Sequence, residues 1–238
     1  PSGLIAAGDD TLTLDPEQLD RLDFFVAELK KNGIYTNLNL NVGRRYMPGD
    51  GVPDSEIDTI QRASMKGFTY LGERLLELQR DYARKLLTHY NPYTQSEYRH
   101  EPAVVTVEIV NENSITEFWA RNWLNGELTA DHPVPQLDLS PRYARILDEK
   151  YQNWLRKHRS EKQLAAMRKL AGVGPGAAIP RTRRGNFRDC PKELFYAEAE
   201  FYMGVESEFF EGMYAYLKED LGVKSLVLAT ADHTYWIP

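Results

Sequence analysis

Apolar residues recur along the chain with two periods, which predict its helices and strands. Spacings of three and four residues, typical of one helix face, predict helices at 16–32, 70–90, 115–126, 140–160, 161–172 and 192–222. Short alternating or continuous apolar runs predict strands at 35–42, 103–110 and 224–232. The expected order is therefore helix, strand, helix, strand, several helices and a last strand.

Local signals support the first of these helices. Asp15 is placed to cap it, Pro16 suits its first turn, and Gly33 suits its end. Its apolar positions recur at helical spacing and predict the buried side; they are Leu19, Leu22, Phe25, Val26 and Leu29.

Alternating helices and strands indicate an α/β fold with a parallel sheet. Each predicted strand changes from apolar to polar residues at its C-terminal end, which is where the active sites of (β/α)8 barrels lie. We therefore predict part of a TIM (β/α)8-type barrel over residues 1–238. A doubly wound sheet is the alternative architecture.

Side-chain alternation predicts a polar face on the sheet. Because successive side chains of a strand point to opposite faces, the polar positions of two strands are expected to meet inside the barrel. These positions are Asn37, Asn39, Asn41, Thr106, Glu108 and Glu112. Buried polar groups need partners, and the amides beside Glu108 would supply them. We expect a structural role for Glu108 and a chemical one for Glu112, which lies at the strand end next to Asn111.

The segment "VEIVNENS" around Glu112 resembles the fourth barrel strand of glycoside hydrolase clan A, in particular the cellulase-like members related to family 5. The segment "LDRLDFFVAELKKNGIYTNLNLNVGRRY" looks like the preceding helix and third strand of the same proteins, and "LGVKSLVLATAD" matches the fifth strand. This resemblance implies that Glu112 is the general acid/base and that Asn111 hydrogen-bonds the sugar 2-hydroxyl. It also implies that the chain spans strands three to five of the barrel, with a helical insertion at 125–222 after strand four, and that the protein is a retaining hydrolase of β-linked sugars.

A retaining glycosidase needs two carboxylates about 5 Å apart. In the resembled clan the nucleophile is a glutamate at the end of the seventh strand, and no segment after residue 230 matches that strand. We therefore expect the nucleophile outside this chain, the chain to be an excerpt of a longer enzyme, and no hydrolysis by the chain alone. The alternative function is a catalytically silent barrel that binds carbohydrate or a protein partner.

Further sugar contacts are expected near the strand ends. Asn41 is the last inward position of its strand, and His233 and Trp236 follow the last strand; each could instead be structural. Arg44 and its neighbour Arg45 could pair with carboxylates around Glu112, although an exposed arginine pair is usually only solvated. The arginine-rich run at 181–184 is interpreted as a solvated charge run.

Composition limits the kinds of binding partner but does not identify a reaction. The formal charge of −6 with interleaved signs disfavours nucleic acid, and no apolar run predicts a membrane span. The single cysteine, Cys190, excludes an intrachain disulfide. No metal-ligand or phosphate-binding motif is seen, so no cofactor is expected, and an oligosaccharide or polysaccharide is the expected substrate. The sugar, the oligomeric state and the compartment are left open, although the resemblance favours secretion or the periplasm.

Overall fold

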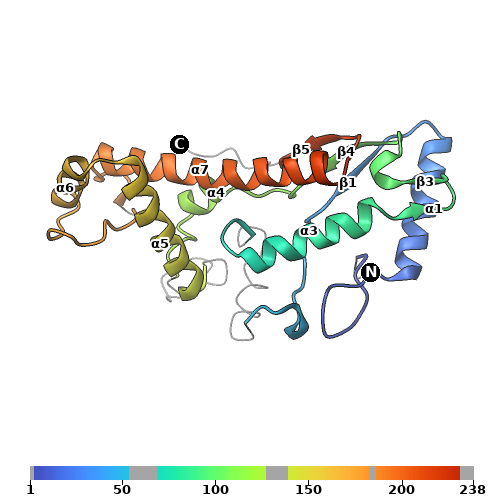
Figure 1. Cartoon of the computed structure of the whole chain (residues 1–238), viewed down its shortest axis with the longest axis horizontal. Helices are drawn as coiled ribbons and strands as arrows, with labels where there is room; N and C mark the ends of the chain where they lie inside the picture. The colour runs from blue at the N-terminus through green and yellow to red at the C-terminus, as the bar shows by residue number, and fades with distance from the viewer. Residues whose placement is uncertain (1–2, 54–68, 127–138, 183–185, 231–238) are drawn as a thin grey trace. The chain divides into compact units, whose positions relative to one another are not determined.

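A computed structural model describes residues 3–53, 69–126, 139–182 and 186–230 (Figure 1). The described residues form two compact units, one of residues 3–113 with 209–230 and one of residues 114–208. The first unit contains the sheet. The second unit is helical and follows the strand at residues 104–108 along the chain.

The first unit contains α1 (Pro16–Lys31), β1 (Thr36–Asn39), η1 (Pro48–Asp50), α3 (Glu73–Leu87), β2 (Tyr90–Asn91), β3 (Ser96–Glu97), η3 (Tyr98–His100), β4 (Val104–Glu108) and β5 (Leu226–Leu228). The second contains α4 (Ile115–Ala120), α5 (Pro141–His158), α6 (Glu161–Leu170) and most of α7 (Lys192–Ala215). The end of α7 belongs to the first unit and continues as the π-helix η6 (Tyr216–Asp220). Each predicted helix and strand is present, but the strands are shorter than expected and the helix predicted at 115–126 ends at Ala120. The short strands β2 and β3 were not predicted.

The start of α1 forms as its sequence predicts, but its buried side differs. The Asp15 side chain accepts hydrogen bonds from the backbone N–H groups of Glu17 and Gln18, which caps the helix. Phe25, predicted to be buried, is 57% exposed, whereas Asp23 is buried. The prediction was wrong here because the helix meets polar partners: Asp23 accepts from the Tyr98 hydroxyl at 2.6 Å and lies 2.7 Å from His89 Nε2. These bonds satisfy a carboxylate that would otherwise be costly to bury.

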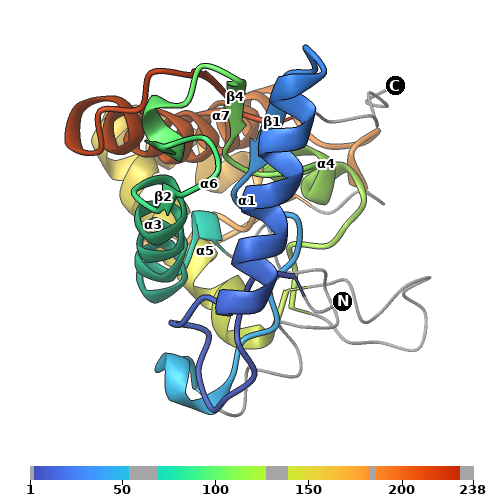
Figure 2. The ribbon, with the colours of Figure 1, turned by 90° about the vertical axis from the view of Figure 1, so that its right-hand side faces the viewer.

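Three parallel strands form the sheet, in the order β1, β4, β5. The strands β1 and β4 lie side by side in both views (Figures 1 and 2). Parallel neighbours that follow the chain order are what a barrel requires, and they also occur in one half of a doubly wound sheet. The described residues contain no closed barrel, so the barrel stays a prediction.

The two faces of this sheet differ in burial. Residues paired across a parallel ladder share a face, and the pair Leu38 and Val107 is 6% and 0% exposed. On the opposite face Asn37 is exposed, and Leu226 and Leu228 are 66% and 41% exposed. One face is therefore packed in the core, and the other, which carries the predicted polar row, is largely uncovered at its β1 and β5 sides.

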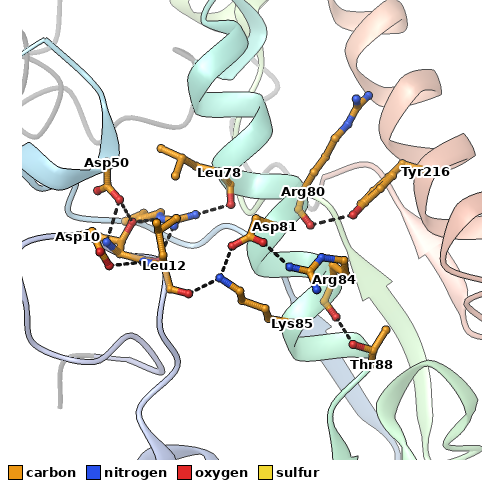
Figure 3. A network of polar contacts seen from close by, with 12 residues as sticks. Asp10, Leu12, Asp50, Leu78, Arg80, Asp81, Arg84, Lys85, Thr88 and Tyr216 are labelled. Atoms are coloured by element: carbon orange, nitrogen blue, oxygen red, sulfur yellow. Dashed lines mark hydrogen bonds and ion pairs between the residues drawn. The ribbon is translucent and has the colours of Figure 1, made fainter.

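A polar network fixes the N-terminal segment to α3 and to the loop after β1. Arg44 donates to the side chain of Thr11 at 2.8 Å, to its carbonyl at 2.7 Å and to the carbonyl of Leu78 at 2.7 Å. Asp50 accepts from the backbone N–H and the hydroxyl of Thr11, both at 2.8 Å. Figure 3 shows Lys85 of α3 between Asp81 and the carbonyl of Leu12, both of which it contacts.

This network corrects the expected role of Arg44. Its donors are used by Thr11 and Leu78, and so Arg44 anchors the fold where a partner for carboxylates around Glu112 was expected. Burial lowers the pKa of Arg44, although the nearby Asp50 opposes this change. The adjacent Arg45 is exposed. Two neighbouring arginines in the sequence thus have different environments.

We expect Arg44→Met to lower the free energy of unfolding by about 2–4 kcal/mol, because it leaves the carbonyls of Thr11 and Leu78 without their donors. Arg45→Met, at an exposed position, is the matched control and should change stability by less than about 0.5 kcal/mol. Urea unfolding of both variants measures the difference. Equal stabilities would show that the Arg44 bonds do not hold the N-terminal segment.

Candidate functional site

The C-terminal ends of the three strands meet, as the sequence predicts for a parallel sheet. Beyond β1 and β4 the pairing continues: Leu40 N–H donates to the Glu108 carbonyl at 2.8 Å, and Asn111 N–H donates to the Asn41 carbonyl at 3.1 Å. Beyond β5, the Thr230 hydroxyl accepts from the N–H of Asn113 at 3.2 Å. Residues 111–113, here called the β4 tip, are therefore held between the ends of both neighbouring strands.

A bulge follows the end of β4, at Ile109 and Val110 just before the tip. The N–H groups of Ile109 and Val110 both donate toward β5, to the carbonyls of Leu228 at 2.9 Å and Ala229 at 3.1 Å. In a regular strand consecutive N–H groups point to opposite neighbours. The alternation assumed beyond Glu108 is therefore wrong, and Glu112 does not share a face with Glu108 by simple counting.

Glu112 has a left-handed backbone conformation. It is exposed, and its φ angle is 47°. The other described non-glycine residues with positive φ are Gln95 (58°), in the turn between β2 and β3, and Asn122 (66°), just after α4. Such a conformation costs about 1 kcal/mol or more in a residue with a side chain, and it is concentrated at functional sites. At the β4 tip this strain falls on the carboxylate that the sequence singled out.

Helix α3 supports the bulge through one buried amide. Gln79 is 2% exposed, and its Nε2 donates to the Ile109 carbonyl at 2.9 Å. Its Oε1 lies 3.5 Å from Nδ2 of Asn41, which is itself buried. Asn41 therefore contacts Gln79 of α3. It does not continue the inward-facing row of amides that was predicted from Asn37 and Asn39. Gln79 was missed in the sequence, where its signal is a polar residue four positions after Leu75 on the apolar stripe of α3.

Glu108 has the amide partner that the sequence predicts. Its Oε2 accepts from Nδ2 of Asn37 at 3.0 Å, and Oδ1 of the same amide accepts from the Thr106 hydroxyl at 2.9 Å. Glu108 is 3% exposed. A buried carboxylate held by an amide of the neighbouring strand fits a structural role.

Asn113, at the end of the tip, is the least satisfied buried side chain of the site. It is 1% exposed, and neither Oδ1 nor Nδ2 has a hydrogen-bond partner among the described residues. Its backbone is bonded on both sides, to Thr230 and through its carbonyl to the Tyr70 hydroxyl at 3.3 Å. A buried amide left unpaired costs about 1–3 kcal/mol. The tip thus combines a strained residue and an unpaired amide in adjacent positions.

The remaining predicted site residues divide into two groups. Asn111 is half-buried at the tip, where the structure brings it next to Glu112 and to the backbone of Asn41. His233 and Trp236 lie outside the described residues. In the ranges that the structure describes, no group of three His, Cys, Asp or Glu side chains could hold a metal ion.

A second polar cluster, buried except for Asp148, lies in the helical unit, where the sequence suggested no site. Asp148 pairs with Arg181 at 2.6 Å, Arg181 donates to the Tyr202 hydroxyl at 3.2 Å, and that hydroxyl donates to Glu198 at 2.8 Å. Glu198 also accepts from the N–H of Thr182 at 2.5 Å. The side chain of Arg181 is 5% exposed, so the solvated role predicted for this arginine is wrong. The cluster ties α5 and the 179–182 segment to α7.

Glu198 itself is fully buried. Burial raises the pKa of its carboxyl from 4.5 to about 6, because hydrogen bonds from Thr182 and Tyr202 only partly offset the loss of hydration. The charged form is therefore disfavoured in the folded state.

No helix in the described part of the chain combines the length and apolar character needed to cross a membrane.

We expect Glu112→Gly to be more stable than Glu112→Ala by about 1 kcal/mol, because glycine adopts a positive φ without strain. Both substitutions remove the same carboxyl group, so the comparison isolates the backbone. Val42, exposed near the same sheet edge and with negative φ, is the control: there glycine should be less stable than alanine. Urea unfolding of the four variants decides, and the same order at both positions would contradict strain at Glu112.

We expect the Glu198 carboxyl to stabilise the protein more at about pH 5 than at about pH 7. A folded-state pKa raised to about 6 means that this stability is complete below 4.5 and is lost as the pH rises through 6. Between pH 5 and pH 7 the loss should be about 1 kcal/mol relative to Glu198→Gln, which does not titrate. Urea unfolding of both proteins at the two pH values measures it. A pH-independent difference between them would disprove the raised pKa.

The comparison with known proteins adds no family to these observations. No family model matches the chain, and no curated protein matches its sequence. The resemblance to clan A glycoside hydrolases therefore rests on the residues of the chain, and the geometry of the β4 tip has to carry the functional argument.

Proposed function

We propose that the chain provides the acid/base half of a retaining glycoside hydrolase acting on β-linked sugars. In this proposal Glu112 is the general acid/base, and Asn111 hydrogen-bonds the sugar. The observation that carries it is the exposed Glu112 in a left-handed conformation at the C-terminal end of the central strand. A strained carboxylate at that edge of a parallel sheet is typical of a catalytic position.

The chemistry proceeds in two steps. First the Glu112 carboxyl group gives its proton to the glycosidic oxygen as the bond to C1 breaks, while a nucleophilic carboxylate forms a bond to C1. Then the Glu112 carboxylate removes a proton from a water molecule, whose oxygen attacks C1 and releases the nucleophile. The sugar keeps its β configuration because C1 is inverted twice.

The nucleophile is proposed to lie outside this chain, on further strands that extend the sheet into a barrel. Two features support this. In the described part of the chain β1 and β5 each have one neighbouring strand, so each has a free edge. Leu226 and Leu228 expose apolar side chains on the face that would become the barrel interior. Additional strands would cover both.

Further sugar contacts are proposed from sequence position. His233 and Trp236 follow Thr230, whose hydroxyl is bonded to the β4 tip. A tryptophan ring can stack on a sugar, and histidine can bond its hydroxyls. Asn41 is proposed to act indirectly, since its amide lies against Gln79, which holds the carbonyl of Ile109.

The decisive experiment measures hydrolysis of aryl β-glycosides by the protein expressed from its complete gene. Glu112→Ala should lower the rate about 10²–10⁴-fold for phenols that are poor leaving groups, and less for dinitrophenol, which leaves without a proton. Azide needs no general base, so it should restore the rate of the dinitrophenyl glycoside and yield the β-glycosyl azide. Glu77→Ala, at an exposed carboxylate of α3, is the control and should leave the rate unchanged.

Two outcomes would contradict the proposal. An unchanged rate for Glu112→Ala would remove the acid/base role. Binding of the glycosides without hydrolysis would favour the alternative function, a catalytically silent barrel that binds carbohydrate or a protein partner.

A further inference from the structure

The unpaired amide of Asn113 contrasts with an equally buried amide in the same unit. Asn91 is 0% exposed; its Nδ2 donates to the Asp23 carbonyl at 3.0 Å, and its Oδ1 accepts from the N–H groups of Tyr93 at 2.8 Å and Thr94 at 3.2 Å. Asn113 is 1% exposed and has no such partner at either atom among the described residues. Folding therefore gives hydrogen-bond partners to both the nitrogen and the oxygen of one buried asparagine amide, and it leaves the donor and the acceptor of the other unused.

The position of Asn113 allows its amide to move while the backbone stays in place. Its N–H is bonded to Thr230 and its carbonyl to Tyr70, so the main chain is held on both sides. Two side-chain bonds, Cα–Cβ and Cβ–Cγ, remain to turn the amide. The preceding residue is the exposed Glu112. A turned amide would therefore emerge beside the carboxylate proposed to act on the substrate.

We propose that Asn113 is a substrate-binding residue whose amide turns out of the protein to bind a sugar hydroxyl next to Glu112. The inference rests on the proposed function and adds to it a second asparagine contact beyond Asn111. The inward conformation leaves two polar atoms unpaired, and the outward conformation gains partners only when ligand is present. A ligand that bonds the outward amide shifts the population toward it.

The chemistry of the amide selects the class of ligand. Nδ2 is a donor and Oδ1 is an acceptor, and both lack partners among the described residues. A carboxylate or phosphate ligand would satisfy only Nδ2, and an ammonium group only Oδ1. Hydroxyl groups donate and accept, so adjacent hydroxyls of one sugar ring satisfy both atoms. The amide is therefore suited to a neutral polyhydroxylated ligand.

The test replaces the amide by an apolar group of similar size. Asn113→Leu should leave the urea midpoint unchanged or raise it, since no buried hydrogen bond is lost, and should weaken sugar binding about tenfold. The probes are methyl β-glucoside, methyl β-mannoside and methyl β-galactoside, titrated by NMR. In the unsubstituted protein, a bound glycoside should shift the side-chain amide resonance of Asn113 and leave that of Asn91 in place.

The matched control is Asn91→Leu, which removes three hydrogen bonds and should lower the urea midpoint. The inference is overturned if Asn113→Leu loses as much stability as Asn91→Leu or fails to fold. It is also overturned if the affinity is unchanged, or if none of the three glycosides binds the unsubstituted protein. These binding measurements do not depend on turnover. Absence of azide rescue in Glu112→Ala would disprove the proposed acid/base role of Glu112. An unchanged sugar affinity in Asn113→Leu would disprove only the proposed role of Asn113.

Discussion

The backbone pairing of β4 with β1 on one side and β5 on the other is the interaction on which the first unit depends. These three strands are far apart in the sequence, and their register places the ends of all three at one edge. The apolar side of β4 makes this pairing favourable, since Val104 and Val107 are 1% and 0% exposed. Only through it does Asn41 meet Asn111, and Thr230 meet Asn113.

The periodic elements could be predicted because the apolar pattern encodes burial. Helix α3 shows this well: Leu75 and Leu78 lie at helical spacing and are each 1% exposed. The same pattern could not say which partner an element meets. It placed Phe25 in the core, whereas the carboxylate of Asp23 is buried because His89 and Tyr98 lie against it. The apolar period reports only hydrophobic side chains, so it does not predict the burial of a polar side chain that has hydrogen-bond partners.

The candidate site was predictable in its position and only partly in its geometry. The change from apolar to polar residues at the end of β4 singles out Asn111 and Glu112, because that edge of a parallel sheet is open to ligands. The bulge before them depends on two carbonyls of another segment, at Leu228 and Ala229, and on the amide of Gln79. No local sequence signal reports these partners, and glutamate is not a residue that predicts a positive φ.

The β4 tip differs from the rest of the described structure in the hydrogen bonding of its buried polar groups. Elsewhere the fold buries charged side chains with their partners, as Arg44 does with Thr11 and as Glu198 does in the helical unit. Among the described residues, Asn113 is the one amide side chain whose buried nitrogen and oxygen both lack a hydrogen-bond partner. It follows directly after Glu112, where the backbone is strained. Stability alone would favour an apolar residue at position 113 and glycine at position 112.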